Sequence, residues 1–249
     1  MNETIETMFA HRSIRAFKDK PLSEEQIHTL VKAAQSASTS SYIQAYSIIG
    51  VKDKKKKKQL AELAGGQSYV EKNGHFFVFC ADYNRHQATS QMHGTDVTET
   101  VQSTEKFMVG LIDAALAAQN ASIAAESMGL GICYIGGIRN DLEKVNDLLN
   151  LPQYVVPLFG LCVGYPDQEP DVKPRLPLEN IYHVDEYEQN EEVFKEELMK
   201  YDDVISAYYT DRTAGQRTGG WTAMMAHKLT TPVRTYMKKF LENKGFPLK

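Results

Sequence analysis

The sequence has few cysteines, and their placement argues against disulfides and metal sites. The 249 residues include only Cys80, Cys133 and Cys162, which are far apart and lie within apolar runs. An odd number of widely separated cysteines predicts buried free thiols in a reducing compartment. No Cys or His pair has zinc spacing. The first residues, MNETIETMFAHRS, include acidic side chains and lack the apolar core of a secretory signal, so we expect a cytoplasmic protein.

The sequence also lacks a strong charge imbalance and an uninterrupted membrane span. Lys and Arg total 28 against 32 Asp and Glu, a formal net charge of -4. This balance argues against electrostatic capture of nucleic acid or of an anionic membrane. The least polar stretch, residues 107–125, contains Asp113, Gln119 and Asn120. Three polar groups predict a buried helix rather than a membrane span.

The common nucleotide-binding and hydrolase motifs are absent. There is no G-x-G-x-x-G after a strand, no G-x-x-x-x-G-K-[ST] and no G-x-S-x-G elbow. Any phosphate-bearing ligand must therefore be bound by side chains from separated segments.

The periodicity of apolar residues predicts helices interleaved with strands, in one domain without an internal repeat or linker. Helices are expected at 23–36, 53–64, 99–128, 141–149, 191–209 and 220–243, and strands at 46–52, 75–81, 132–135 and 155–164. Residues 82–98 are polar and without a clear pattern, and the lysine run 54–58 is typical of a solvated helix face. Helix 99–128 is apolar on most sides, so it must be enclosed by the core, by a second subunit, or by both. The arrangement predicts a three-layer α+β or α/β domain.

Two basic clusters could hold a phosphate. His11, Arg12, Ser13 and Arg15 fall within HRSIR, where alternate residues of an extended backbone point the same way. Lys173-Pro174-Arg175 places two cations on either side of a stiff proline. Each cluster alone is more typical of a solvated turn than of a ligand site. Together with the hydroxyls of Ser38, Thr39, Ser40 and Ser41, they would make a phosphate cage.

Two further segments could contact a ring system. Tyr134-Ile135-Gly136-Gly137 ends a predicted strand, and its glycines permit a close approach of a ligand to backbone N–H groups, although a simple turn explains them equally. Gln67 and Tyr69 follow Gly65-Gly66 and could hydrogen-bond the edge of a heterocycle, or could lie in a surface loop.

Five motifs in order resemble the FMN-dependent nitroreductases, and more narrowly the bacterial branch of flavin reductases and oxygen-insensitive NADPH nitroreductases. They are HRSIR (11–15), ASTSSYIQ (37–44), GGQSY (65–69), YIGGIRND (134–141) and KPRLP (173–177). The resemblance implies an α+β, three-layer fold with a central mixed, mainly antiparallel sheet flanked by helices. It also implies an intertwined homodimer in which residues 180–249 form a helical extension of the single domain 1–249 and pack on the partner.

The resemblance assigns each motif to a part of one tightly bound FMN per subunit. It implies that His11, Ser13, Lys173 and Arg175 hold the phosphate, with Arg12 in the same motif. Ser38, Thr39 and Ser40 would line the ribityl and isoalloxazine side, some of them across the subunit interface. Arg15 would lie at the N1 and O2 edge, Gln67 and Tyr69 at the rest of the pyrimidine ring, and residues 134–137, namely Tyr134, Ile135, Gly136 and Gly137, near N5 and O4.

The implied activity is ping-pong hydride transfer from NAD(P)H to a small acceptor such as free FMN, a nitroaromatic, a quinone or an azo compound. No side chain need act as nucleophile or base, because the cofactor carries the chemistry. Arg212 and Arg217, in the loop 210–219, could bind the 2′-phosphate of NADPH, so we favour NADPH while allowing NADH. Three alternatives remain open: a non-catalytic FMN carrier, a flavin enzyme of the same fold with a specialised substrate, and a helical binding module on residues 186–200.

Overall fold

Two very apolar segments form the centre of a four-stranded sheet in the computed structural model, which describes residues 1–249. β2 (His75–Asp82) and β4 (Val155–Gly164) are buried along almost their whole length and pair with each other. β1 (Tyr46–Val51) pairs with β2, and β3 (Gly131–Ile135) pairs with β4. The order is β1-β2-β4-β3 and every pair is antiparallel, so the four expected strands are confirmed. The expected mixed sheet is wrong for these strands, and parallel pairing is confined to an isolated bridge between Ser13 and Ile132.

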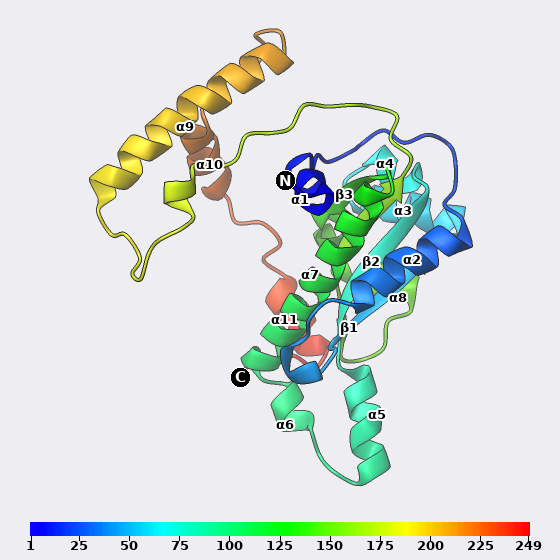
Figure 1. Cartoon of the computed structure of the whole chain (residues 1–249). Coiled ribbons are helices and arrows are strands. Elements are labelled where there is room, and N and C mark those ends of the chain that lie inside the picture. Colours follow the sequence, from blue (N-terminus) through cyan, green and yellow to red (C-terminus); the bar gives the residue numbers. More distant parts are fainter. The chain divides into compact units, whose positions relative to one another are not determined.

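Helices cover both faces of the sheet and make three layers, as predicted (Figure 1). Along β2, Phe77 and Phe79 pack into one hydrophobic cluster, while Phe76 and Val78 pack into the other. This alternation is the period of two of a strand buried on both faces. The first face is covered by α2 (Glu24–Gln35) and α7 (Thr104–Ser127), and the second by α3 (Lys54–Leu63) and α8 (Leu142–Leu149).

α7 is the central helix of the first layer. It is long and apolar enough to cross a membrane by length and composition alone, but so are core helices of soluble proteins. Here Ala114, Ala117 and Ala121 pack into the core, as predicted for a buried helix. The expected helix 99–128 is in fact α6 (Thr98–Val101) followed by α7, because the Ser103 side chain caps a new helix by accepting a hydrogen bond from the backbone N–H of Lys106.

Two expected helix boundaries are confirmed in detail. The Ser23 side chain accepts from the Gln26 N–H while the Gln26 side chain accepts from the Ser23 N–H, which is a capping box. At the other end of α7, Gly129 has a φ of +72°, the left-handed conformation that glycine adopts at little cost.

Two expectations about irregular and C-terminal segments are wrong. The polar stretch 82–98 contains α5 (Asn84–His93), which buries only Ser90 and so leaves no hydrophobic periodicity to detect. The expected helix 220–243 is two helices, α10 (Trp221–Leu229) and α11 (Met237–Asn243). Pro232 lies between them, where it cannot continue a helix.

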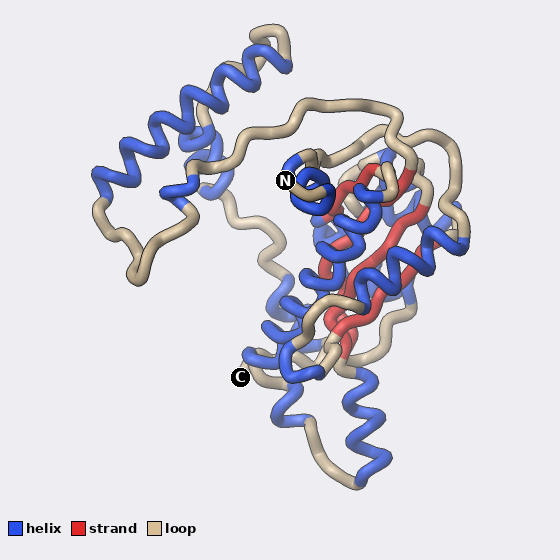
Figure 2. The backbone as a smooth tube through the Cα atoms, in the orientation of Figure 1, coloured by secondary structure: helices blue, strands red, loops and turns tan.

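The chain divides into two compact units, residues 1–170 with 234–249, and residues 171–233. The first unit also contains α1 (Glu3–Phe9), α4 (Ser68–Glu71) and the 3-10 turns η1 (Ser40–Tyr42) and η2 (Gly136–Asn140). The second has no strand (Figure 2) and consists of η3 (Leu178–Asn180), α9 (Glu191–Arg212) and α10. Tyr201, Ile205 and Tyr209 of α9 form its core. Packing of residues 180–249 on a partner stays a prediction.

Candidate functional site

The HRSIR segment runs along the edge strand β3. Ser13 forms a parallel bridge with Ile132, and the Ile14 N–H donates to the Ile132 carbonyl at 2.8 Å. Ile14 is 4% exposed and anchors the segment, whereas Arg15 is exposed. The extended backbone expected for this motif is therefore confirmed, and it leaves the Arg15 guanidinium accessible to a ligand.

Arg15, Tyr69 and Gln67 meet beside this edge. The Tyr69 hydroxyl donates to Gln67 Oε1 at 2.7 Å and also contacts the Arg15 guanidinium. Burial raises the pKa of Tyr69, so its hydroxyl keeps its proton at neutral pH. Two motifs separated by fifty residues of sequence thus form one cluster that offers a cation, a hydroxyl and a carboxamide.

Gly137 completes this cluster from β3's far end. A Cβ at this position would lie 2.5 Å from the Ala64 carbonyl oxygen and 3.0 Å from Gln67 Nε2. Gln67 Nε2 itself donates to the Ala64 carbonyl at 2.9 Å. The close approach that Gly137 permits is therefore between two segments of the chain, and it fixes Gln67 against η2. Gly136 faces the Arg139 guanidinium in the same turn.

Tyr134 lies half-exposed at the end of β3. Its hydroxyl accepts a hydrogen bond from Ser122 Oγ at 2.9 Å, and its ring packs against Phe159. Burial of the hydroxyl end raises the pKa of Tyr134. Ile135, the next residue, is completely buried.

His11 and Arg12 are paired with carboxylates. His11 Nδ1 lies 2.6 Å from Glu126 Oε1, near the C-terminal end of α7. The Arg12 guanidinium donates to Glu169 Oε1 at 3.1 Å. Glu169 is almost fully exposed, so this second pair contributes little and leaves Arg12 available to another anion.

Ser38, Thr39 and Ser40 lie in a loop fixed by a buried carboxylate. Asp113 is fully buried and accepts hydrogen bonds at 3.0 Å from the backbone N–H groups of both Ser40 and Ala45. Asp113 and Glu126 are thirteen residues apart on α7, which is roughly 20 Å along a helix axis. Within one chain the structure therefore does not bring the serine loop to His11.

The predicted cations of the second unit form their own group. The Lys173 ammonium lies 5.4 Å, and the Arg217 guanidinium 3.7 Å, from the centre of the Tyr209 ring. Lys173 and the nearby arginines lower the pKa of Tyr209, with the Lys173 hydrogen bond as the largest cause. Arg212 donates to the Tyr208 hydroxyl at 2.6 Å, and Arg175 donates to the Lys173 carbonyl at 3.0 Å. Lys173, predicted for the FMN phosphate, and Arg217, predicted for the NADPH 2′-phosphate, thus lie against the same ring.

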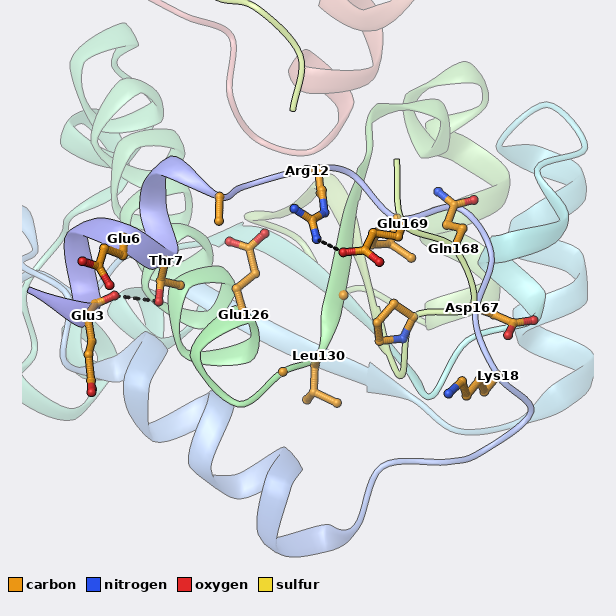
Figure 3. Close-up of a pocket in the computed structure, with 15 residues that line it drawn as sticks. Glu3, Glu6, Thr7, Arg12, Lys18, Glu126, Leu130, Asp167, Gln168 and Glu169 are labelled. Carbon is orange, nitrogen blue, oxygen red and sulfur yellow. Dashed lines mark hydrogen bonds and ion pairs between the residues drawn. The ribbon is translucent and has the colours of Figure 1, made fainter. Parts of the chain in front are cut away.

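A cavity of about 850 Å3 lies beside α1 (Figure 3). Arg15, Gln67 and Tyr69 do not line it. Of the predicted cofactor residues only Arg12 lines it. Five carboxylates face the cavity, including Glu3, Glu6 and Asp167, against two cations. That charge would repel a phosphate.

The residues of these arrangements that are not predicted as site residues include Asp113, Ser122, Glu126 and Arg139. In the sequence Asp113 is a polar interruption of an apolar helix, and a carboxylate there must be buried with hydrogen-bond partners. The other three act through contacts between distant segments, for which the sequence offers no local signal.

Comparisons with known proteins show the family of this chain. Residues 8–165 match the model of the nitroreductase family, and residues 173–249 match the model of the nitroreductase family C-terminal domain. The chain is 56% identical over 246 residues to "FMN reductase (NADPH)" of Bacillus subtilis, with 99% of both sequences covered.

Solved structures extend the similarity to the fold. "Structure of B. megaterium NfrA1" superposes with a TM-score of 0.98 at 60% identity, and covers 99% of this chain and 100% of that one. "NADPH:FMN oxidoreductase from Vibrio harveyi complexed with NAD+" superposes with a TM-score of 0.88 at 40% identity over the whole of both chains. The chain therefore belongs to the nitroreductase family.

Proposed function

We propose that this chain is an NADPH-dependent oxidoreductase that uses bound FMN to reduce small acceptors, namely free FMN, nitroaromatics, quinones or azo compounds. The observation that carries the proposal is the convergence of Arg15, Tyr69, Gln67 and Gly137 beside β3. The Bacillus subtilis relative, described as an FMN reductase that uses NADPH, supports the same activity.

The chemistry of this cluster fits the pyrimidine side of FMN. That edge of the flavin alternates carbonyl oxygens with ring nitrogens and takes up negative charge on reduction. Arg15 offers five N–H donors and a permanent positive charge, and Gln67 offers both a donor and an acceptor. Because the guanidinium is exposed, its remaining donors are free for the ligand.

FMN, when bound, supplies the capacity to accept a hydride from NADPH and to pass it to a second substrate. The chain's own residues stabilise charge and position. The Arg15 cation would favour negative charge on the pyrimidine edge of a bound FMN, and a fixed cation needs no reorganisation during the reaction. Tyr69 holds Gln67, and Gly137 lets Gln67 pack against the backbone of Ala64, so the cluster is pre-organised.

We assign the FMN phosphate to His11, Ser13, Lys173 and Arg175, with Arg12 as a further cation. The support is the chemistry of these side chains and the resemblance of their motifs. The contact with Glu126 holds the His11 ring in place. Arg212 and Arg217 are assigned to the NADPH 2′-phosphate. Replacing Arg217 by Gln should raise the KM for NADPH and leave the KM for NADH unchanged.

The active form is proposed to be a homodimer formed through α7. Apolar side chains are exposed along one side of this helix, at Met108, Leu111, Ile112 and Leu116. Their spacing of three and four residues makes one continuous stripe, and such stripes mark interfaces. A dimer across α7 would also give Ser38, Thr39 and Ser40 a role, because they lie too far from His11 in their own chain and would contact the flavin of the partner.

Steady-state kinetics test the proposal. With FMN-loaded protein, NADPH and free FMN varied together should give parallel double-reciprocal lines, because the two substrates bind in turn at one site. NADPH should show a higher kcat/KM than NADH. Failure of the holoprotein to oxidise either coenzyme with any of the named acceptors would favour a non-catalytic FMN carrier.

A further inference from the structure

A second cavity in the first unit lies apart from the flavin cluster. It has a volume of about 610 Å3 and is formed by residues 17–27, by the end of β1 with the start of α3, and by the turn 71–75 before β2. None of the residues assigned above to FMN or NADPH lines it. A volume of this size is typical of small-molecule sites, which span roughly 300–1,000 Å3.

The cavity is positively charged although the chain as a whole is negative. Its lining includes five lysines but only three carboxylates, and the net charge of the chain is -4. The five are Lys18, Lys52, Lys54, Lys57 and Lys72. Lys54 is the first residue of α3, so the positive end of that helix dipole also lies at the cavity. One lysine is offset by an ion pair, since Lys52 lies 2.5 Å from Glu24.

For Lys57 the prediction that the lysine run 54–58 is a solvated helix face is wrong. Its neighbours Lys55, Lys56 and Lys58 are exposed, but Lys57 is only 7% exposed and donates to the Asn73 carbonyl at 3.0 Å. Burial lowers the pKa of Lys57. An ammonium has three donors, and a buried one is costly unless its charge is balanced. An anion in the cavity would balance it.

His75 supplies a second unexplained buried group. It is 3% exposed, and its Nε2 has no hydrogen-bond partner. Burial and the charges of Lys57 and Lys52 lower its pKa to about 4, so the ring is neutral at pH 7. Gly50 lets the ring pack closely against β1, since a Cβ there would lie 2.7 Å from that nitrogen. A neutral imidazole can donate from Nε2 to an anionic oxygen.

We propose that this cavity binds a small anion that carries phosphate groups, at a site separate from the flavin site. The donors come from different segments of the chain. They are the buried ammonium of Lys57, the unpartnered Nε2 of His75 and the exposed ammonium groups of Lys54 and Lys72. Compact ammonium groups are common ligands of phosphate oxygens. This inference does not depend on the proposed oxidoreductase activity.

The test is calorimetric titration of the FMN-saturated full chain with inorganic pyrophosphate. Two double variants with equal loss of charge are compared. Lys54→Gln with Lys72→Gln removes two exposed lysines that line the cavity, and Lys55→Gln with Lys58→Gln removes two exposed lysines that do not. All four side chains are exposed, so both variants should fold.

We expect one pyrophosphate site per chain whose Kd rises at least about tenfold in the first variant, which is about 1.4 kcal/mol, and stays near the wild-type value in the second. The ring proton resonances of His75, identified by their loss in His75→Gln, should shift on titration. Absence of binding, equal weakening in both variants, or an unmoved His75 resonance would overturn the proposal.

Discussion

Replacing Asp113 by Asn tests how the serine loop is held. The substitution conserves shape but removes the charge of a fully buried side chain that accepts two backbone N–H groups at 3.0 Å. An Asn side chain has one carbonyl oxygen, so it can accept from Ser40 or from Ala45 but its amide group must face the other donor. A buried N–H is then left without an acceptor.

The size of the effect follows from these two bonds. A hydrogen bond to a charged group contributes about 1.5–3 kcal/mol, and an unsatisfied buried donor costs a similar amount. We therefore expect the Asn variant to lose about 2–3 kcal/mol at the loop. If the loss is local, the amide of Ala45, which is completely buried, should exchange with solvent roughly 30- to 150-fold faster, since 1.4 kcal/mol is tenfold.

Native-state hydrogen exchange of the Ser40 and Ala45 amides is the assay, and FMN affinity is a second readout because the loop is proposed to reach the flavin of the partner. Asp203→Asn is the matched control, since Asp203 is exposed on α9. Unchanged exchange at both amides would refute the role of Asp113, whatever happens to activity.

Three other predictions concern packing, pH and assembly. Gly137→Ala should destabilise the protein by about 1–3 kcal/mol in urea unfolding and weaken FMN binding, because the new Cβ would meet the Ala64 carbonyl. Gly219→Ala is the control and should be neutral, because a Cβ there meets nothing within 4 Å. The pKa of His75 is lowered from 6.5 to about 4 in the folded chain, so the unfolded chain takes up this proton at a higher pH than the folded chain does. The free energy of unfolding should therefore fall by up to about 3 kcal/mol as the pH drops from 6.5 to 4. His75→Phe should flatten this dependence. Leu116→Glu should convert the proposed dimer to monomers in sedimentation velocity, and an unchanged sedimentation coefficient would place the interface elsewhere.

Local patterns in the sequence predict most of the fold. The alternation in β2 and the capping box at Ser23 depend on neighbouring residues, and both are confirmed. α5 escaped prediction because it buries only Ser90 and so has no apolar face to create a pattern. Pro232 could have predicted the end of α10, since proline cannot continue a helix. The apolar residues on both sides of it instead favoured one continuous helix.

The site was predictable as a set of residues but not as a geometry. The motifs predicted Arg15, Gln67 and Tyr69 as site residues, and these three side chains lie together in the structure. The support from Asp113 and the closeness of Gly137 to Ala64 depend on contacts between segments far apart in sequence. Lys57 lies on the same face of α3 as the buried Leu60 and Ala61, but its bond to the Asn73 carbonyl depends on a contact between separate segments.

The central claim is that the chain binds FMN and that NADPH reduces it. The most direct test is the visible absorbance spectrum of the purified, FMN-loaded protein during anaerobic titration with NADPH. We expect loss of the oxidised-flavin band with one equivalent of NADPH per bound FMN, and recovery of the band when an acceptor is added. A protein that takes up no FMN, or a yellow protein whose spectrum neither NADPH nor NADH changes, would contradict it.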